Sequence, residues 1–93
     1  MNKYEIMFIV KPDVEEEARN TLIENFKNIL KANGGTVDNV NEWGLRDLAY
    51  EIQDFKKGYY VVVDTTCTAA DVAEFERLSN INSSMLRHLT LRK

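Results

Sequence analysis

Apolar and polar residues alternate along the first segment of the chain, Lys3 to Val10. A period of two is typical of a β-strand that buries one face and exposes the other. We therefore expect a strand here, ended by the Pro12-Asp13 pair. Its core face should hold Tyr4, Ile6, Phe8 and Val10, and its opposite face Lys3, Glu5, Met7 and Ile9.

The next segment, from Val14 to Leu30, has apolar residues at the spacing of a helix. Apolar residues recur at intervals of three and four, which predicts an amphipathic helix with one buried stripe. Asp13 is expected to cap this helix, with Glu16 as its capping-box partner. Gly34 is expected to end it, because glycine readily takes the left-handed conformation. The predicted stripe consists of Val14, Ala18, Leu22, Phe26, Ile29 and Leu30.

The middle of the chain predicts two strands joined by a turn. Thr36–Leu45 alternates imperfectly, since Val37 and Val40 are out of phase, which indicates a bulge or a strong twist. Residues 48–52 are expected to continue this strand. The turn is expected at Asp54–Gly58 and the third strand at Tyr59–Thr66.

The last third of the chain predicts a shorter helix and a final strand. Thr68–Asp71 is a capping signal, and Val72, Phe75 and Leu78 should face inward. The final strand is expected at Met85–Arg92. Its core face should hold Leu89 and Leu91, and its other face His88 and Thr90.

The predicted order is strand, helix, strand, strand, helix, strand. Two split strand–helix–strand units with right-handed crossovers give an α+β fold, the ferredoxin-like βαββαβ sandwich. We expect one four-stranded antiparallel sheet with both helices on one face. The first and third strands should be central, and residues 1–93 should form a single domain.

Composition narrows the class of protein. The chain is 44% hydrophobic and 29% charged, as in ordinary globular proteins. Its one cysteine, Cys67, cannot form an internal disulfide, which favours a reducing compartment. Because Cys67 and His88 stand apart as the only soft ligands, we expect no metal site and no cofactor. The apolar run before Lys11 is too short to span a membrane, so we expect a soluble, cytoplasmic protein with no membrane partner.

The charge is unevenly distributed. A net charge of −3 argues against nucleic-acid binding when it is taken alone. However, residues 1–12 and 85–93 together carry five basic residues and one acidic residue, a net charge of +4. The predicted fold makes these two strands neighbours, so we expect a basic sheet edge that can face phosphates.

Several side chains suggest binding, and none suggests catalysis. His88 has no identifiable nucleophile or orienting acid, whereas Arg87 suits phosphate geometry. Trp43 fits either core packing under the hairpin or a partner contact. The apolar sheet face away from the helices is expected to be exposed and to dock a partner protein. That face comprises Met7, Ile9, Tyr60 and Val62.

The chain resembles the bacterial small-subunit (30S) ribosomal protein S6 family over nearly its full length. The resemblance rests on residues in the family's order and spacing, and the segment Trp43-Gly44 with Leu48-Ala49-Tyr50 is its most specific part. The other matching residues are Tyr4-Glu5-Ile6, Pro12, Gly34-Gly35, Gly58-Tyr59 and Arg87.

The resemblance implies a ferredoxin-like fold, no enzyme activity and a structural role in the central platform of the small ribosomal subunit. It also implies binding to 16S rRNA together with ribosomal protein S18, in support of translation. Glu51 stands where many relatives have proline, and Asp47 where a second basic residue is common; both lower the positive potential beside Arg46. The implied contacts, not assigned individually to RNA or protein, are Lys3, Tyr4, Arg46, Tyr50, Arg87 and Arg92.

Three alternatives are weaker or remain open. A stand-alone RRM-like RNA-binding module needs exposed aromatic residues on both central strands, and the first strand lacks one. An acylphosphatase-like enzyme needs an anion-binding loop after the first strand, where Val10-Lys11-Pro12-Asp13 is unsuitable; no small-molecule substrate is expected. A regulatory oligomer that associates through the open sheet face remains possible from sequence.

Overall fold

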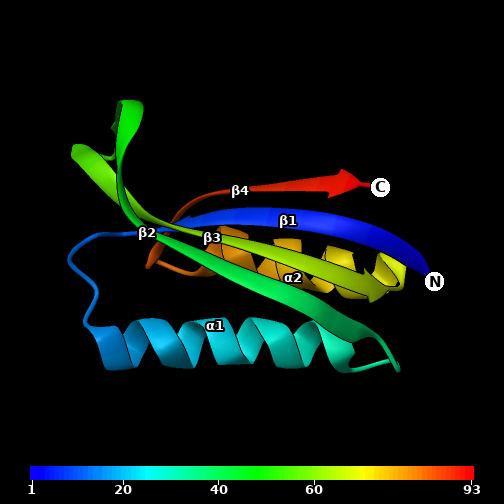
Figure 1. Cartoon of the computed structure of the whole chain (residues 1–93). Helices are drawn as coiled ribbons and strands as arrows, with labels where there is room; N and C mark the ends of the chain where they lie inside the picture. Colours follow the sequence, from blue (N-terminus) through cyan, green and yellow to red (C-terminus); the bar gives the residue numbers. More distant parts are fainter.

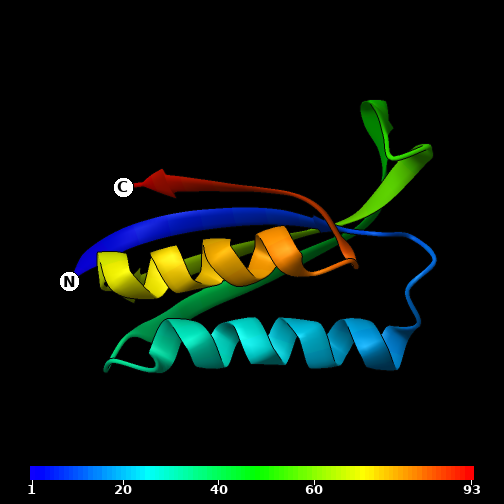
Figure 2. The same ribbon diagram turned by 180° about the vertical axis from the view of Figure 1, so that it is seen from behind.

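The computed structural model describes residues 1–93, and both helices cover the same face of one sheet (Figure 1; Figure 2). The antiparallel strands lie in the order β2-β3-β1-β4. The predicted ferredoxin-like topology is thus confirmed, with β1 and β3 central. The elements are β1 (Asn2–Val10), α1 (Glu16–Lys31), β2 (Thr36–Ile52), β3 (Phe55–Cys67), α2 (Ala69–Ile81) and β4 (Met85–Arg92).

The core lies between the sheet and the helices. Its centre is an aromatic cluster from three elements, in which the Phe26 ring meets Phe8 and Phe75 edge to face at centroid distances of 5.6 and 4.9 Å. Edge-to-face packing of this kind is favourable for aromatic pairs. The alternation of β1 is confirmed, since its predicted core face is buried. That face consists of Tyr4, Ile6, Phe8 and Val10.

Helix α1 begins later than the sequence predicts. Asp13 does not cap it; Glu15 occupies the N-cap position and makes no capping side-chain hydrogen bond. The reason is a turn in which the Val14 N–H donates to the Lys11 carbonyl, so that Asp13 lies within the turn. The buried stripe differs accordingly: Ala18 is exposed. The buried residues of α1 are Leu22, Ile23, Phe26 and Leu30.

The other caps agree with the sequence. Gly34, which follows α1, has a φ of +83°, in the left-handed region that favours glycine. At the start of α2 the Thr68 hydroxyl accepts a hydrogen bond from the Asp71 N–H at 3.2 Å. Val72 and Phe75 are buried beneath this helix, and Leu78 packs against the core.

Strands β2 and β3 form a long hairpin with a tighter turn than predicted. The turn is not at 54–58 but at Gln53 and Asp54, whose φ angles are +51° and +68°. Two central residues with positive φ match the right-handed twist of a hairpin. The expected irregularity of β2 is confirmed by register shifts at Val37/Asn39 and Glu42/Gly44.

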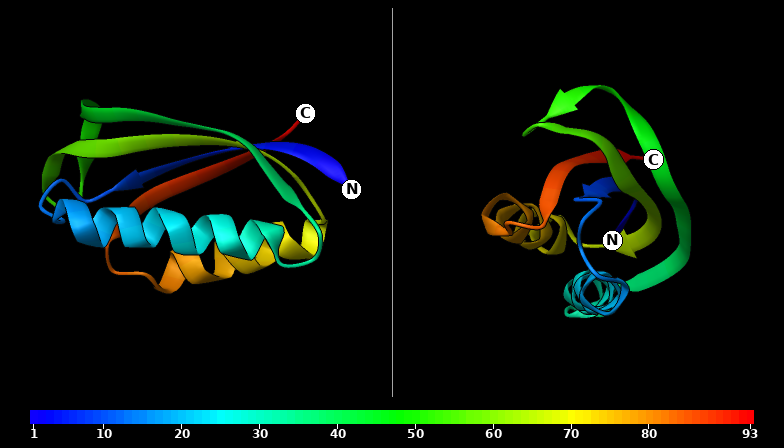
Figure 3. Two further views of the ribbon diagram at one scale, coloured as in Figure 1. Left: turned by 60° about the horizontal axis from the view of Figure 1, so that its bottom comes forward. Right: turned by 90° about the vertical axis from the view of Figure 1, so that its left-hand side faces the viewer.

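The hairpin continues beyond the sheet as an arm, residues 46–58. Asp47 pairs with Lys57 and Ile52 with Phe55, so four residues of β2 face only Lys56 of β3. Extra residues in one strand bend it and increase its twist. The arm accordingly rises from the sheet on the side away from the helices and curves over that side (Figure 1; Figure 3).

Strand β4 presents the opposite face to the one predicted. Thr90 pairs with Ile6 and His88 with Phe8, so both β4 residues face the helices. The imidazole of His88 lies edge-on to Phe75 at 6.0 Å. Leu89 and Leu91 therefore face away from the helices, and the prediction that they belong to the core is wrong.

Candidate functional site

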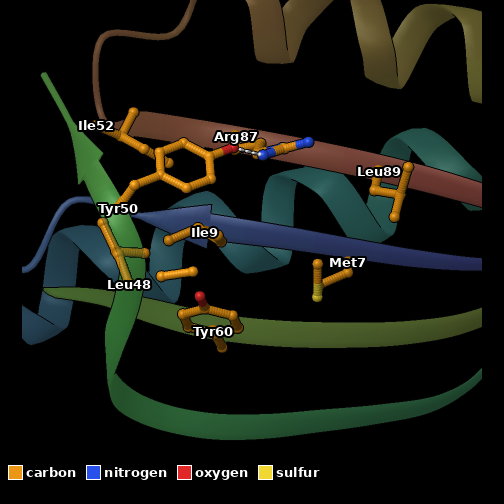
Figure 4. A pocket seen from close by; sticks show the side chains of 9 residues that line it. Met7, Ile9, Leu48, Tyr50, Ile52, Tyr60, Arg87 and Leu89 are labelled. Carbon is orange, nitrogen blue, oxygen red and sulfur yellow. Dashed lines mark hydrogen bonds between the residues drawn. The ribbon is translucent and has the colours of Figure 1, made fainter.

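The sheet face away from the helices, here called the open face, is hollowed where the arm curves over it. The resulting groove has a volume of about 270 Å³. Its lining comes from β1, β3, β4 and the arm, and Arg87 is its only charged residue. The lining residues are Met7, Ile9, Leu48, Ala49, Tyr50, Ile52, Tyr60, Arg87 and Leu89, and Figure 4 shows their side chains around the hollow.

The arm reaches the sheet because of local sequence. Leu48, Tyr50 and Ile52 alternate along the arm and all line the groove. Gly58 in β3 lets the arm approach β1, since a Cβ at this position would overlap Cγ2 of Ile9. The groove therefore depends on one glycine and on the period-two pattern of the arm.

Exposure of the open face differs from expectation. Met7, Ile9, Tyr60 and Val62 all lie on this face, as the cross-strand pairing shows. However, Ile9 is only 3% exposed and Val62 only 7%, so the prediction that they are exposed is wrong. The arm covers Ile9, and Val62 lies on a central strand between Met7 and Asn41. The exposed apolar surface on this face comes instead from Leu89 and Leu91 of β4 and from Trp43 and Tyr50 of β2.

A hydrogen bond closes one side of the groove. The Arg87 guanidinium donates to the Tyr50 hydroxyl, joining β4 to the arm (Figure 4). A phenol is neutral at ordinary pH, and Arg87 forms no ion pair. Arg87 thus places an uncompensated positive charge beside an apolar hollow.

Trp43 and Arg46 lie on β2 where the arm begins. Trp43 is 50% exposed, so it is not buried under the hairpin. Its indole stacks in parallel on the Tyr60 ring, with centroids 6.2 Å apart and an interplanar angle of 3°. Arg46 Nε donates to the Trp43 carbonyl oxygen at 3.2 Å and forms no ion pair.

The opposite end of the sheet carries Lys3, Arg92 and Lys93, and there acids compensate Lys93. Lys93 Nζ lies 2.8 Å from Asp64 Oδ1 and 3.6 Å from Glu5 Oε2. The hydrogen bond to Asp64 raises the pKa of Lys93, and the Asp64 and Glu5 charges act in the same direction. A second hollow here, of about 260 Å³, is mainly polar. Its lining consists of Lys3, Tyr4, Asp38, Asn39, Asp64, Thr65 and Lys93.

The predicted contact residues therefore do not form one continuous basic edge. The structure brings Tyr50 and Arg87 together at the groove and places Arg46 at the start of the arm. Lys3, Tyr4 and Arg92 lie at the other end of the sheet, and Tyr4 is buried in the core. Whether each residue contacts RNA or protein stays a prediction.

Sequence reasoning missed four groove residues, Leu48, Ala49, Ile52 and Leu89. Leu48 and Ile52 could have been found, because they alternate with Tyr50 along the arm. Leu89 was assigned to the wrong face of β4.

Other reactive side chains offer no comparable site. Cys67 is buried, and burial raises the pKa of its thiol, which makes it a poor nucleophile. No cluster of three or more His, Cys, Asp or Glu side chains is arranged to hold a metal ion. Neither helix combines the length and apolar character needed to cross a membrane.

Comparison with known proteins gives a consistent result. The family model described as ribosomal protein S6 matches residues 3–92. The chain is similar to the crystal structure of 30S ribosomal protein S6 from Thermotoga maritima, with 35% identity and a TM-score of 0.91; the match covers 99% of this chain and 87% of that one. The chain is also similar to the crystal structure of a protein from Arabidopsis thaliana, with 17% identity and a TM-score of 0.57; the match covers 100% of this chain and 93% of that one. This second likeness shows the fold alone.

Proposed function

Because the chain belongs to the ribosomal protein S6 family, we propose that it binds 16S rRNA in the central platform of the small subunit jointly with ribosomal protein S18. Its role is structural, within the cytoplasmic ribosome. One observation carries this proposal beyond the family assignment: the apolar groove under the arm has an uncompensated Arg87 at its side.

The groove is the docking site for the partner protein. Apart from Arg87 its lining is apolar or aromatic, and Leu89 and Leu91 extend the apolar surface along β4. Continuous apolar surface of this kind marks interaction sites on soluble proteins. A hollow of about 270 Å³ accommodates a few side chains rather than a domain, so we expect the partner to insert apolar anchors here.

RNA contacts surround this docking site. Arg87 and Arg46 form no ion pair, so each retains its charge for a phosphate oxygen. Phosphate contacts position a protein without reading sequence. Since the whole chain carries a net charge of −3, its own affinity for RNA should be weak, and the partner must supply much of the positive charge.

The test is a titration of a 16S rRNA platform fragment with this chain, with S18, and with both, by filter binding at two salt concentrations. We expect strong binding only when both proteins are present, and weaker binding at the higher salt concentration. Tight, salt-insensitive binding by this chain alone would contradict the proposal and favour a stand-alone RRM-like RNA-binding module. Absence of binding by the pair would also overturn it.

A further inference from the structure

We propose that Trp43 and Arg46 bind one unpaired nucleotide of the RNA, with its base stacked on the outer face of the indole and its phosphate on the guanidinium. The inference rests on the proposed RNA-binding function and adds a specific site to it.

The indole of Trp43 is fixed in place but only half covered. One face stacks on Tyr60, with an interplanar angle of 3° between the rings. Trp43 remains 50% exposed, so half of its surface is available to a ligand. Tyr60 is itself held by the groove, where it lines the wall beside Ile9. A preoriented aromatic surface loses little entropy on binding a second ring.

The backbone leaves room above this surface. Glu42 pairs with Val61 and Gly44 with Tyr60, so Trp43 is the extra residue of a bulge in β2. Gly44 has a φ of +84°, and a Cβ placed on it would meet nothing within 4 Å. Bulges of this kind redirect a side chain out of the sheet. The indole thus stands at an open part of the surface.

The local charge favours an anionic ligand. The Arg46 guanidinium lies beside the Trp43 backbone, because its Nε donates to the Trp43 carbonyl oxygen, and no carboxylate pairs with it. The nearest acid in sequence, Asp47, lies 4.0 Å from Lys57 Nζ. Glu42 is occupied elsewhere, since it accepts a hydrogen bond from the Tyr59 hydroxyl at 3.0 Å.

A planar surface beside an uncompensated guanidinium matches the two parts of a nucleotide. Bases stack on aromatic side chains in single-stranded RNA recognition, and arginine binds phosphate. A purely apolar protein anchor would use the indole but leave the Arg46 charge without a function. The pair of residues therefore favours RNA over protein as the ligand.

The first experiment measures binding of the platform fragment by this chain with S18. Trp43→Leu should weaken binding by about 10- to 100-fold, the scale of one stacked base, while Trp43→Phe should retain most of the affinity. Arg46→Gln should lower the slope of log affinity against log salt by about one. Leu45→Ala is the matched control, since Leu45 is exposed on the same strand; it should change affinity less than about twofold.

A second experiment separates base stacking from a protein contact. Abasic substitutions along the fragment should reveal one nucleotide whose removal makes Trp43→Leu harmless, which is the coupling expected of a direct contact. Trp43→Leu should leave the affinity for S18 without RNA unchanged. Absence of such a nucleotide, or loss of affinity between the two proteins, would overturn the site while the wild-type joint binding still supports the proposed function.

A third measurement observes the indole directly. Trp43 is the only tryptophan of the chain, so a fluorotryptophan label introduced into this chain alone reports this residue in ¹⁹F spectra. We expect its resonance to move when the fragment is added to the two-protein complex. A resonance that responds to S18 but not to RNA would contradict the proposal.

Discussion

The two ends of the open face both carry basic residues, but the ends differ in whether carboxylates lie beside the charge. At the arm, Arg87 is held by a neutral phenol and Arg46 by a backbone carbonyl. At the end where the chain termini meet, Lys93 lies beside two carboxylates. Arg92 pairs with Tyr4 and so lies on the helix side of β4, where it donates to the neutral Asn2 side chain at 2.9 Å.

The difference lies in the cross-strand neighbours. Asp64 comes from β3 and pairs with Glu5 of β1, which places two acids beside Lys93. No acid reaches the groove under the arm, where the neighbours are apolar. A count of basic residues along a strand therefore does not locate a phosphate-binding surface; the charges of adjacent strands decide it.

The first prediction disrupts the arm end while a matched variant disrupts the other end. In Gly58→Ala the new Cβ would overlap Ile9 Cγ2 and push the arm off β1. In Gly35→Ala it would overlap the Leu30 carbonyl, far from the groove. Each should lower the free energy of unfolding by about 1–3 kcal/mol in thermal or urea denaturation.

Only Gly58→Ala should also weaken binding to S18. If the whole cost of about 1–3 kcal/mol falls on the arm that forms the groove, the affinity should drop by roughly 5- to 150-fold. Calorimetric titration of the folded variants measures this. Equal losses of affinity in both variants would show that general destabilisation, not the groove, determines binding.

The second prediction compares one arginine from each end. Arg87→Ala should weaken joint binding to the RNA fragment by about tenfold, because a charge-assisted hydrogen bond is lost. Its salt slope should fall by about one. Arg92→Ala should change affinity less than about twofold. Filter binding at several salt concentrations tests both, and a larger effect of Arg92→Ala would reverse the assignment of the two ends.

The third prediction removes one of the two acids beside Lys93, so that this end of the open face resembles the arm end more closely. Asp64→Asn removes the main cause of the raised pKa of Lys93, which should fall toward its ordinary value. The freed charge should raise the weak RNA affinity of the isolated chain at low salt by roughly two- to fivefold. Titration of Lys93 by NMR and filter binding measure the two effects. Unchanged RNA affinity despite a lowered pKa would show that pairing with acids is not what keeps the Lys93 charge from binding RNA.

The smallest effect concerns acid stability at the same end. Hydrogen bonds from Thr66 and Thr36 lower the pKa of Asp38 in the folded chain. A lowered carboxyl pKa contributes stability above its unfolded value, and this contribution is lost as pH falls through the folded value. Asp38→Asn should therefore flatten the loss of stability below about pH 4 and leave the pH dependence near neutrality unchanged. Urea denaturation from pH 2 to 7 checks this; parallel curves would contradict it.

The sequence predicts the fold well wherever residues close together in the chain determine the structure. The alternation of β1 identifies the core face, and Thr68 identifies the start of α2. The bounds of β4 are also correct, at Met85–Arg92. These features depend on neighbouring residues in the chain, so the sequence contains the information they require.

The errors occur where long-range pairing decides. Leu89 and Leu91 alternate correctly in β4, but only pairing with β1, with its shift at Ile9/Val10, determines which face they take. The arm bends because β2 has more residues than β3 between two paired positions, which neither strand shows alone. For the same reason the sequence gives the groove residues Tyr50 and Arg87 but not their hydrogen bond.

The most direct test of the central claim, that the arm end is the interaction surface, is amide NMR mapping of this chain upon addition of S18. The account predicts that the largest changes occur at Met7, Leu48, Tyr50, Tyr60, Arg87 and Leu89, with little change at Lys3, Asp38, Asp64 and Lys93. Changes centred on the second group, or on the helices, would contradict it.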